Sequence, residues 1–596
     1  MNPKEPSLER LPDAGLPFPA AWIDSDPRKV EAIFSEMPVE DQARLVMRLE
    51  GAQRQKLLLL SRNSVQVTRA LPPEDVYLMI KELGDSSALS VLSMMSEEQV
   101  QFVFDVEWWD GDRFVPKRAL EWLTRLDQCD EPQVLNWLGT EEFDQKVMVF
   151  QSFIKVFKYD EMTDSFENTE GLPHFSPDGV YEIFFKVRAY DPIKKILLLL
   201  HSEDPSLFMS LMEAVIWYPL TQTVEKAWRW RLVRTSARGI PEFEEAFEVY
   251  SRVDPSALQL GGPSPEDFME KGESRLPPQY PLTHYDSSTF FGRCMARLQD
   301  TTRMDAIRWE LAVLFNKVLV ADRLDPSSLE DRNRIVKKVL GYCNIGLETS
   351  AGGDVLKGAK LLQRTWLQFL FQAGYHQVMK LKWKAETFLN DAGPLLKYLT
   401  AQGDQDQLVA LIGRFPQVGE FMMPGEPLQW RDFESVGDVQ KIETYLRRWA
   451  FYLRFAKKGL ELSETKIDRF LNECNFPENK EDVNLLGWVT MALARFTLFQ
   501  EIACEPLSEV AARSFLEMIF LQRIYKDNAG TCREEIIQAF HQRLLQTAMA
   551  WTEEDRHFLA GLIQECVANL ESHFGRLNPK GKIEWKFTRG LCIRAE

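Results

Sequence analysis

Apolar and polar positions near the start of the chain repeat at a fixed distance. The segment 37–41 (MPVED) recurs as 71–75 (LPPED), and Leu49 and Leu83 follow their segments by eight residues each. In both places the acidic pair opens a stretch with apolar residues at helical spacing. The period of about 34 residues is typical of stacked helical units, which bury their apolar faces against their neighbours. The pattern therefore predicts an irregular helical-repeat superhelix in this part of the chain.

Local signals mark the starts of individual helices. The dipeptide 26–27 (Asp-Pro) offers an N-cap followed by a proline that suits the first helical position. Ser96 and Gln99 have the spacing of a capping box, and we interpret them as the start of a third repeat unit. We expect a further helix over 180–187. The acidic pairs of the repeat are interpreted as first-turn residues that complement the helix dipole.

Helical spacing dominates the second half of the chain as well. Apolar residues from Ile307 to Leu319 fall at positions 0, 4, 7, 8, 11 and 12, and Thr552 begins a helix that carries Phe558 and Leu562. Only the segment 582–587 alternates like a strand. The predicted fold is all-α, with a second helical domain after the superhelix. The predicted organisation is a flexible arm at 1–20, a helical-repeat domain at 21–253, a Pro-rich linker or loop at 254–288 and a C-terminal helical domain at 289–596.

Composition narrows the classes of function. The chain has 596 residues and a net charge of −18, which disfavours contact with nucleic acid and anionic membranes. Its longest apolar run is far shorter than the roughly 20 residues that span a bilayer, and the first residues lack an apolar signal region. The eight cysteines form no C-x-x-C pair, which favours reduced, buried thiols. We therefore expect a soluble cytoplasmic protein without membrane insertion.

Four common nucleotide-binding and catalytic motifs are absent from the sequence. There is no P-loop, no G-x-G-x-x-G after a strand, no H-E-x-x-H and no G-x-S-x-G. We therefore predict no catalytic residues and no cofactor. Three of the seven histidines, His541, His557 and His573, follow one another at even spacing. Facing helices could bring two of them together with nearby carboxylates as metal ligands. Surface or capping positions are the favoured interpretation, so we predict no metal site, and the three histidines are its only weak candidates.

One segment joins cations to aromatic rings, and it is the candidate interaction surface of the sequence. Its members are Trp228, Arg229, Trp230, Arg231 and Arg234. Such a segment can contact phosphates and stack on bases. It can also form an amphipathic helix whose arginines cover the tryptophan rings and pair with the acidic run that follows at 242–248. The acidic chain favours the second interpretation, and the same holds for 447–449 (RRW). The basic tail from residue 576 could dock on the chain's own acidic surface, on a partner or on RNA, and the sequence does not decide among these three.

Two resemblances follow from these residues. The leucine-rich helices of 30–104, with their L-P-P-E-D starts, resemble the superhelical cytoplasmic N-domain of bacterial magnesium transporters and the helical repeats of the flagellar motor switch protein. This resemblance implies a stack of short helices that serves as a regulatory or protein-binding surface. Through the stretch 238–250 (RGIPEFEEAFEVY) and the Asp-Pro at 254–255, the whole chain resembles an uncharacterised bacterial family, a domain of unknown function.

Three functional hypotheses follow. The first is a non-enzymatic cytoplasmic protein that binds another protein as a scaffold or regulator. The second is an enzyme or metal-binding protein with a site in the C-terminal helical region. The third is RNA binding through the basic and aromatic segments.

Overall fold

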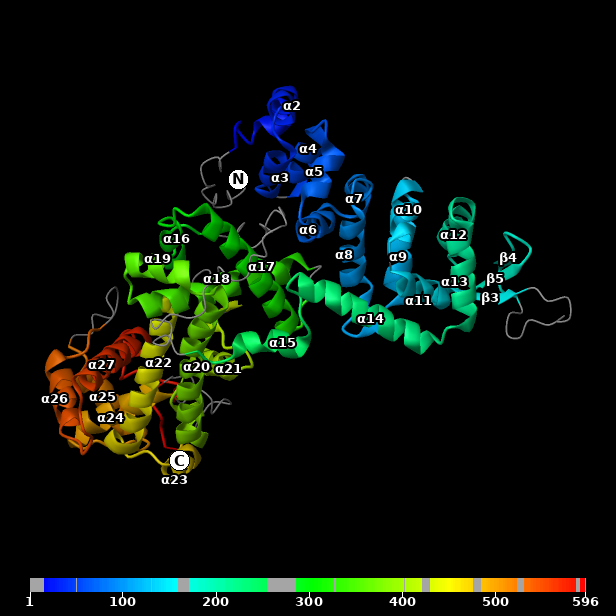
Figure 1. The fold of residues 1–596 in the computed structure, drawn as a ribbon. Coiled ribbons are helices and arrows are strands. Elements are labelled where there is room, and N and C mark those ends of the chain that lie inside the picture. Colours follow the sequence, from blue (N-terminus) through cyan, green and yellow to red (C-terminus); the bar gives the residue numbers. More distant parts are fainter. Residues whose placement is uncertain are drawn as a thin grey trace. The chain divides into compact units, whose positions relative to one another are not determined.

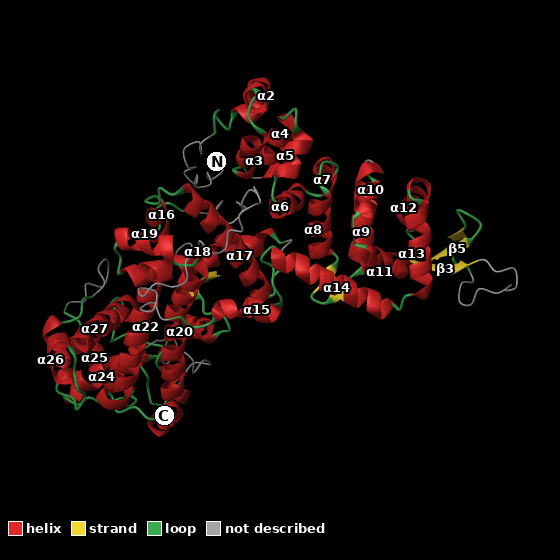
Figure 2. Cartoon of the chain, viewed as in Figure 1, coloured by secondary structure: helices red, strands yellow, loops and turns green. Residues whose placement is uncertain are grey.

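The computed structural model describes most of the chain and separates it into two compact units. It describes residues 16–49, 51–129, 131–140, 142–158, 171–253, 286–325, 328–400, 402–420, 429–474, 484–521, 530–585 and 590–594. The first unit is Met1–Gly374 and the second is Tyr375–Glu596. Helices dominate both units, which confirms the predicted all-α class (Figure 2). The predicted linker at 254–288 lies outside the described residues up to residue 285, as does the predicted arm up to residue 15, so the predicted domain boundaries stay predictions.

The first unit begins with short helices joined by tight turns. These helices are α1 (Trp22–Ser25), α2 (Pro27–Ser35), α3 (Val39–Met47), α4 (Gly51–Leu60), α5 (Ser64–Ala70), α6 (Pro73–Leu83), α7 (Asp85–Leu92), α8 (Glu97–Glu107), α9 (Pro116–Asp127), α10 (Glu131–Gly139) and α11 (Phe143–Phe153). The predicted starts at Pro27 and Pro73 are confirmed, because each proline occupies the first helical turn. The capping box of Ser96 and Gln99 is present at the start of α8.

Three pairs of helix starts in this region follow the sequence period. The starts of α3 and α6 are one period apart, as are those of α4 and α7, and the starts of α5 and α8 are one residue closer than that. Ser96 therefore precedes the third helix of the second group, and our interpretation of it as the start of a new unit is wrong. Ser96 follows the start of the second repeat segment, Leu71, by less than one period, because Ser96 corresponds to the start of α5 and not to that of α3.

Two buried glutamines that lie one period apart in the chain make the same kind of contact. Gln99 Nε2 donates to the carbonyls of Thr68 and Leu71, each at 2.8 Å, at the end of α5. Gln133 Nε2 donates to the carbonyls of Ser93 and Met95, at 2.6 and 3.2 Å, just after α7. Each glutamine thereby donates to carbonyls at or just after a helix end, where intrahelical donors are lacking, although the Thr68 carbonyl also accepts from the Leu71 N–H at 3.1 Å.

Helices further along the unit stand side by side, and one long helix runs across their ends (Figure 1). The additional helices of this part are α12 (Asp191–Glu203), α13 (Pro205–Trp217), α14 (Leu220–Ala237) and α15 (Phe243–Phe247). The long helix α14 contacts α11 and α8. Fully buried Trp108 and Trp137 lie with ring centroids 6.0 Å apart inside the stack.

Small strands interrupt the helices at two places in the first unit. A hairpin of β1 (Trp109–Asp110) and β2 (Arg113–Phe114) follows α8, and a three-stranded antiparallel sheet has the order β3-β5-β4. Its strands are β3 (Ile154–Lys158), β4 (His174–Phe175) and β5 (Tyr181–Phe185). The helix that we predicted over 180–187 is therefore wrong. The segment YEIFF is rich in aromatic and β-branched residues, and pairing with β3 along its whole length decides its conformation.

The first unit closes with longer helices in tight contact. They are α16 (Phe290–Met295), α17 (Thr301–Asp322), α18 (Leu329–Ala351), α19 (Val355–Arg364) and the start of α20 (Leu367–Ala392). Glycines allow α18 and α20 to approach closely, because a Cβ on Gly346 would lie 1.9 Å from the carbonyl oxygen of Leu370. A Cβ on Gly374 would lie 2.0 Å from the carbonyl oxygen of Tyr342. Only glycine fits at either crossing point.

The second unit is a helical assembly around buried Trp449 and Trp488. After the rest of α20 its helices are α21 (Gln402–Ile412), α22 (Val436–Arg454), α23 (Glu464–Glu473), α24 (Leu485–Phe499), α25 (Glu509–Ile519), α26 (Glu534–Leu545) and α27 (Glu553–Phe574). A short hairpin pairs β6 (Val418–Glu420) with β7 (Gln429–Arg431). The predicted start at Thr552 is confirmed by a capping box with Asp555. The predicted strand at 582–587 is wrong for the described residues 582–585, which form no ladder with another segment.

Candidate binding cleft

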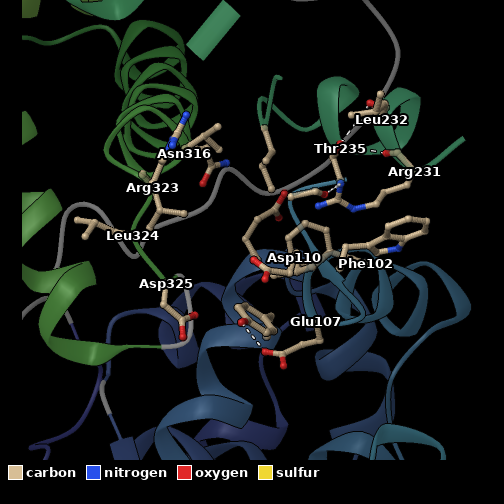
Figure 3. A pocket seen from close by; sticks show the side chains of 18 of the residues that line it. Phe102, Glu107, Asp110, Arg231, Leu232, Thr235, Asn316, Arg323, Leu324 and Asp325 are labelled. Atoms are coloured by element: carbon tan, nitrogen blue, oxygen red, sulfur yellow. Dashed lines mark hydrogen bonds between the residues drawn. The ribbon is translucent and has the colours of Figure 1, made fainter. Parts of the chain in front are cut away.

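A cleft of about 980 Å³ opens in the first unit. It lies between α6, α8, the β1–β2 hairpin, α9, α14, α15 and the last turns of α17 (Figure 3). All its lining residues fall between positions 74 and 332, so the whole cleft belongs to this unit. The lining combines eight acidic and six basic side chains with the rings of Tyr, Phe and Trp residues.

A carboxylate at the end of α8 holds three helices together beside the cleft. Glu107 accepts hydrogen bonds from the Tyr77 hydroxyl at 2.7 Å, from Lys81 Nζ at 3.0 Å and from Trp122 Nε1 at 3.3 Å. The donors come from α6 and α9. Burial, with the nearby Glu107 carboxylate, raises the pKa of Tyr77 well above its usual range. Tyr77 therefore stays protonated at neutral pH and serves as a donor, not as a base.

Two arginines of the predicted interaction segment fasten α14 to α8. Arg234 donates from Nε and Nη2 to the two carboxylate oxygens of Asp105, each at 2.7 Å, and also pairs with Glu142. Arg231 Nε donates to the Asp105 carbonyl at 2.6 Å, and its Nη1 donates to the Gly111 carbonyl at 3.3 Å. Asp105 is 2% exposed, and burial raises the pKa of its carboxyl group. A forked, charge-assisted contact of this kind is among the strongest polar contacts in proteins.

The structure distributes the rest of the predicted segment over different surroundings. Trp228 lines the cleft, Arg229 pairs with Glu225 one turn away on α14, and Trp230 is 54% exposed. The acidic partners of the arginines are thus in α8, at residue 142 and in α14 itself, not in the run 242–248 that we expected. A role of these five residues as one interaction surface stays a prediction.

The acidic pairs at the repeated helix starts differ in burial. Both lie in first helical turns, as predicted, but Glu40 and Asp41 are exposed, whereas Glu74 and Asp75 are 5% and 2% exposed. Glu74 lines the cleft, and its Oε1 accepts from Arg238 Nη1 at 3.4 Å. Its Oε2 is buried and has no hydrogen-bond partner in the described part of the chain. Burial raises the pKa of the Glu74 carboxyl group.

The mouth of the cleft carries exposed carboxylates that make no ion pair with described residues. They are Asp110, Asp112, Glu121, Glu242 and Glu244.

The lining cations, in contrast, contact the cleft walls. Besides Lys81 and Arg231, Arg118 donates to the Trp109 carbonyl at 3.3 Å, and the guanidinium groups of Arg125 and Arg323 lie 4.7 and 4.4 Å from the ring centres of Trp122 and Phe243. These contacts place the cations against the walls without neutralising their charge, and the lining has a net negative charge because eight acidic side chains face six basic ones.

The candidate histidines of the C-terminal region are dispersed. His541 lies on α26, whereas His557 and His573 are exposed residues of α27. Sixteen residues of one helix place His557 and His573 about 24 Å apart along its axis. Within the described residues, no group of three or more His, Cys, Asp and Glu side chains is placed to hold a metal ion.

The other basic segments make internal contacts in the second unit. Arg447 pairs with Glu554 at 3.0 Å, and Arg448 lies 3.7 Å from Asp404. Trp449, the third residue of this basic segment on α22, is fully buried. In the basic tail, Arg594 lies 3.5 Å from Glu473. These distances agree with docking of charged residues on the chain's own acidic groups.

Sequence reasoning missed the acidic residues that organise the cleft. Asp105 had one usable signal, since it is the only charged residue between Gln99 and Val106, where four of the other five residues are apolar. Such a residue, when buried, requires a partner. The sequence gives no sign that this partner lies 129 residues away in α14.

These observations define a class of protein: a predominantly helical protein with an open cleft that is lined by charged and aromatic side chains. The chain belongs to a family of unknown function (DUF6178), whose sequence profile matches residues 31–594. This membership confirms the resemblance to an uncharacterised family. No curated protein and no solved structure matches the chain, so the resemblance to magnesium-transporter and motor-switch domains stays a prediction. In the described part of the chain, no helix is both long and apolar enough to cross a membrane.

Proposed function

We propose that the first unit is a protein-binding module and that its cleft takes up a polypeptide segment of another protein. The chain would then act as a scaffold or regulator, not as an enzyme. The composition of the cleft is the observation that carries this proposal. Fourteen of its lining residues are charged, and most of the others are aromatic or aliphatic. Small-molecule sites are mostly apolar with few polar groups, whereas protein interfaces combine Tyr, Trp and Arg with a polar rim.

The arrangement of short helices supports the same proposal. Helix starts that follow the sequence period, and glutamines that cap preceding helices at the same period, are consistent with a helical repeat. Stacked helical units offer extended surfaces for other macromolecules. We further propose a cytoplasmic location, supported by eight cysteines that are all free thiols.

The two alternative functions have less support. The three histidines that would hold a metal lie apart, and two of the arginines that would contact RNA are engaged by Asp105 and Glu142.

A photo-crosslinking experiment in the native cell tests the proposal. A photoreactive amino acid replaces Glu121, an exposed residue of the cleft mouth, and in a second strain it replaces Glu36, an exposed residue outside the cleft. Cross-linked peptides are identified by mass spectrometry. We expect the same partner segment to recur at position 121 and to be absent at position 36.

A pair of neighbouring substitutions on α14 provides the matched control. Leu232→Trp fills the cleft, whereas Val233→Trp changes the adjacent residue, which is 59% exposed and does not line it (Figure 3). The cross-link should disappear with the first variant and persist with the second. Equal cross-linking in both variants, or no recurring segment at position 121, would refute the proposed function.

A further inference from the structure

We propose that the segment bound by the cleft is basic, with several Lys or Arg side chains. This inference rests on the proposed function and names the chemistry of the partner. It starts from the imbalance between the two kinds of charge at the cleft. Carboxylates outnumber cations in the lining by eight to six, and five of these carboxylates are exposed without an ion pair among the described residues. Five of the six lining cations, in contrast, contact carbonyls, rings or Glu107.

A buried carboxyl group inside the cleft gives the second, independent observation. Glu74 is 5% exposed, lines the cleft and has one oxygen without a hydrogen-bond donor in the described structure. Its other oxygen accepts from Arg238 at 3.4 Å, and Arg238 also pairs with Glu98. A buried acceptor without a partner is costly, and a donor brought by a ligand would remove that cost.

The rings of the cleft favour the same kind of ligand. Arg231, Arg238 and Arg323 lie 5.6, 5.6 and 4.4 Å from the ring centres of Trp109, Phe102 and Phe243. The cleft walls therefore already attract guanidinium groups to aromatic faces.

Trp228 lines the same cleft, is partly exposed and makes no cation–π contact with described residues. Its ring is available to an incoming Arg or Lys. The net charge of −18 adds a long-range field that speeds the approach of a basic partner.

Binding of short peptides to the full-length protein tests this inference. The probe is a fluorescein-labelled ten-residue peptide of alternating Arg and Gly, and its acidic counterpart alternates Glu and Gly. Fluorescence anisotropy at about 50 mM and about 200 mM salt gives the affinities. We expect the basic peptide to bind, its affinity to fall at the higher salt concentration and the acidic peptide not to bind.

Two charge-matched variants locate the binding site. Each removes four exposed carboxylates and so changes the net charge equally, and circular dichroism checks that both fold. The cleft variant is Asp110→Asn, Asp112→Asn, Glu242→Gln and Glu244→Gln. The control variant is Glu36→Gln, Glu40→Gln, Asp41→Asn and Glu203→Gln. We expect at least a tenfold loss of affinity for the cleft variant and less than a threefold loss for the control.

A second pair of variants tests the proposed ring contact on the same helix. Trp228→Leu should weaken binding about fivefold, whereas Trp230→Leu, which changes an exposed tryptophan outside the cleft, should leave the affinity unchanged. Equal losses in the carboxylate pair would overturn the inference, because binding would then reflect the overall acidity of the surface. Equal losses in the tryptophan pair would overturn the proposed ring contact, because binding would then not depend on the cleft. Absence of binding by the unsubstituted protein would overturn it as well.

Competition with spermine, a polyamine, distinguishes a basic polypeptide segment from a small polycation as the ligand of the cleft. Spermine should displace the peptide only at far higher concentration, because a segment also offers backbone groups and side-chain stems to the walls. Displacement at equal concentration would overturn the inference. If the cross-link at position 121 identifies a neutral or acidic segment, the present inference fails while the proposed function stands. If no segment is cross-linked there, the proposed function itself fails.

Discussion

Lys146 on α11 allows a direct test of the free-energy cost of burying a charge in the interior of the first unit. The side chain is 1% exposed, and its Nζ donates to the carbonyl and the hydroxyl oxygen of Thr140, the hydroxyl at 3.1 Å. Burial lowers the pKa of Lys146 from 10.5 to about 8, although Glu142 opposes this shift. Keeping the amine charged at pH 7 therefore costs about 3 kcal/mol, since each pKa unit corresponds to about 1.4 kcal/mol.

The sign of the pH dependence follows from proton binding. Between pH 8 and 10.5 the unfolded chain holds more protons at this amine than the folded chain, so stability rises with pH in that window. The cost is fully present below pH 8 and is lost as the pH approaches 10.5. From pH 7 to pH 9.5 the wild type should gain about 2 kcal/mol through this group. Lys146→Met, which has similar volume and no charge, should not gain this contribution.

The assay compares urea unfolding of the wild type and Lys146→Met at the two pH values. Pulse hydrogen exchange read on peptides of α11 follows the first unit separately from the second. The difference in unfolding free energy between the two proteins should shift by about 2 kcal/mol in favour of the wild type at pH 9.5. Lys117→Met, at an exposed site on α9, controls for the removal of a surface lysine. A difference that stays constant with pH would refute the reasoning.

Three further predictions concern contacts that hold the first unit together. Arg234→Met should destabilise the unit by about 3–5 kcal/mol, because it leaves the buried Asp105 without its main partner, and the double variant Arg234→Met, Asp105→Leu should recover most of this loss in a double-mutant cycle. Gly346→Ala should lower the unfolding free energy by about 1–3 kcal/mol, because the added Cβ would overlap the Leu370 carbonyl, and an unchanged value would contradict the close approach of α18 and α20. Gln99→Met should cost about 1–3 kcal/mol and speed hydrogen exchange at the end of α5, because the Leu71 carbonyl loses its side-chain donor while the Thr68 carbonyl keeps the Leu71 N–H. Exchange that changes only in α8 would contradict this role.

Helix starts were the part of the fold most readily predicted from the sequence. The prolines at 27 and 73 and the capping box of Ser96 each act within a few residues of chain, so their signals are complete in the local sequence. The segment 181–185 was predicted as a helix and is a strand, because its conformation depends on pairing with β3, a strand well before it in the chain. Local signals also placed Ser96 in the wrong position within the period, since a capping box marks a helix start but not which helix of a group begins there.

Local patterns and composition are sufficient to show that this protein is predominantly helical, that short helices follow one another near its start and that its net charge is strongly negative. Each of these properties depends on composition or on residues close together in the chain. Which charges remain accessible depends instead on the three-dimensional fold. It brings Arg231 and Arg234 to Asp105, and Arg238 to Glu74 across 164 residues, while five carboxylates at the cleft mouth stay exposed. The physical reason is that the burial and pairing of a charge depend on what surrounds it in space, and those neighbours come from distant segments of the chain.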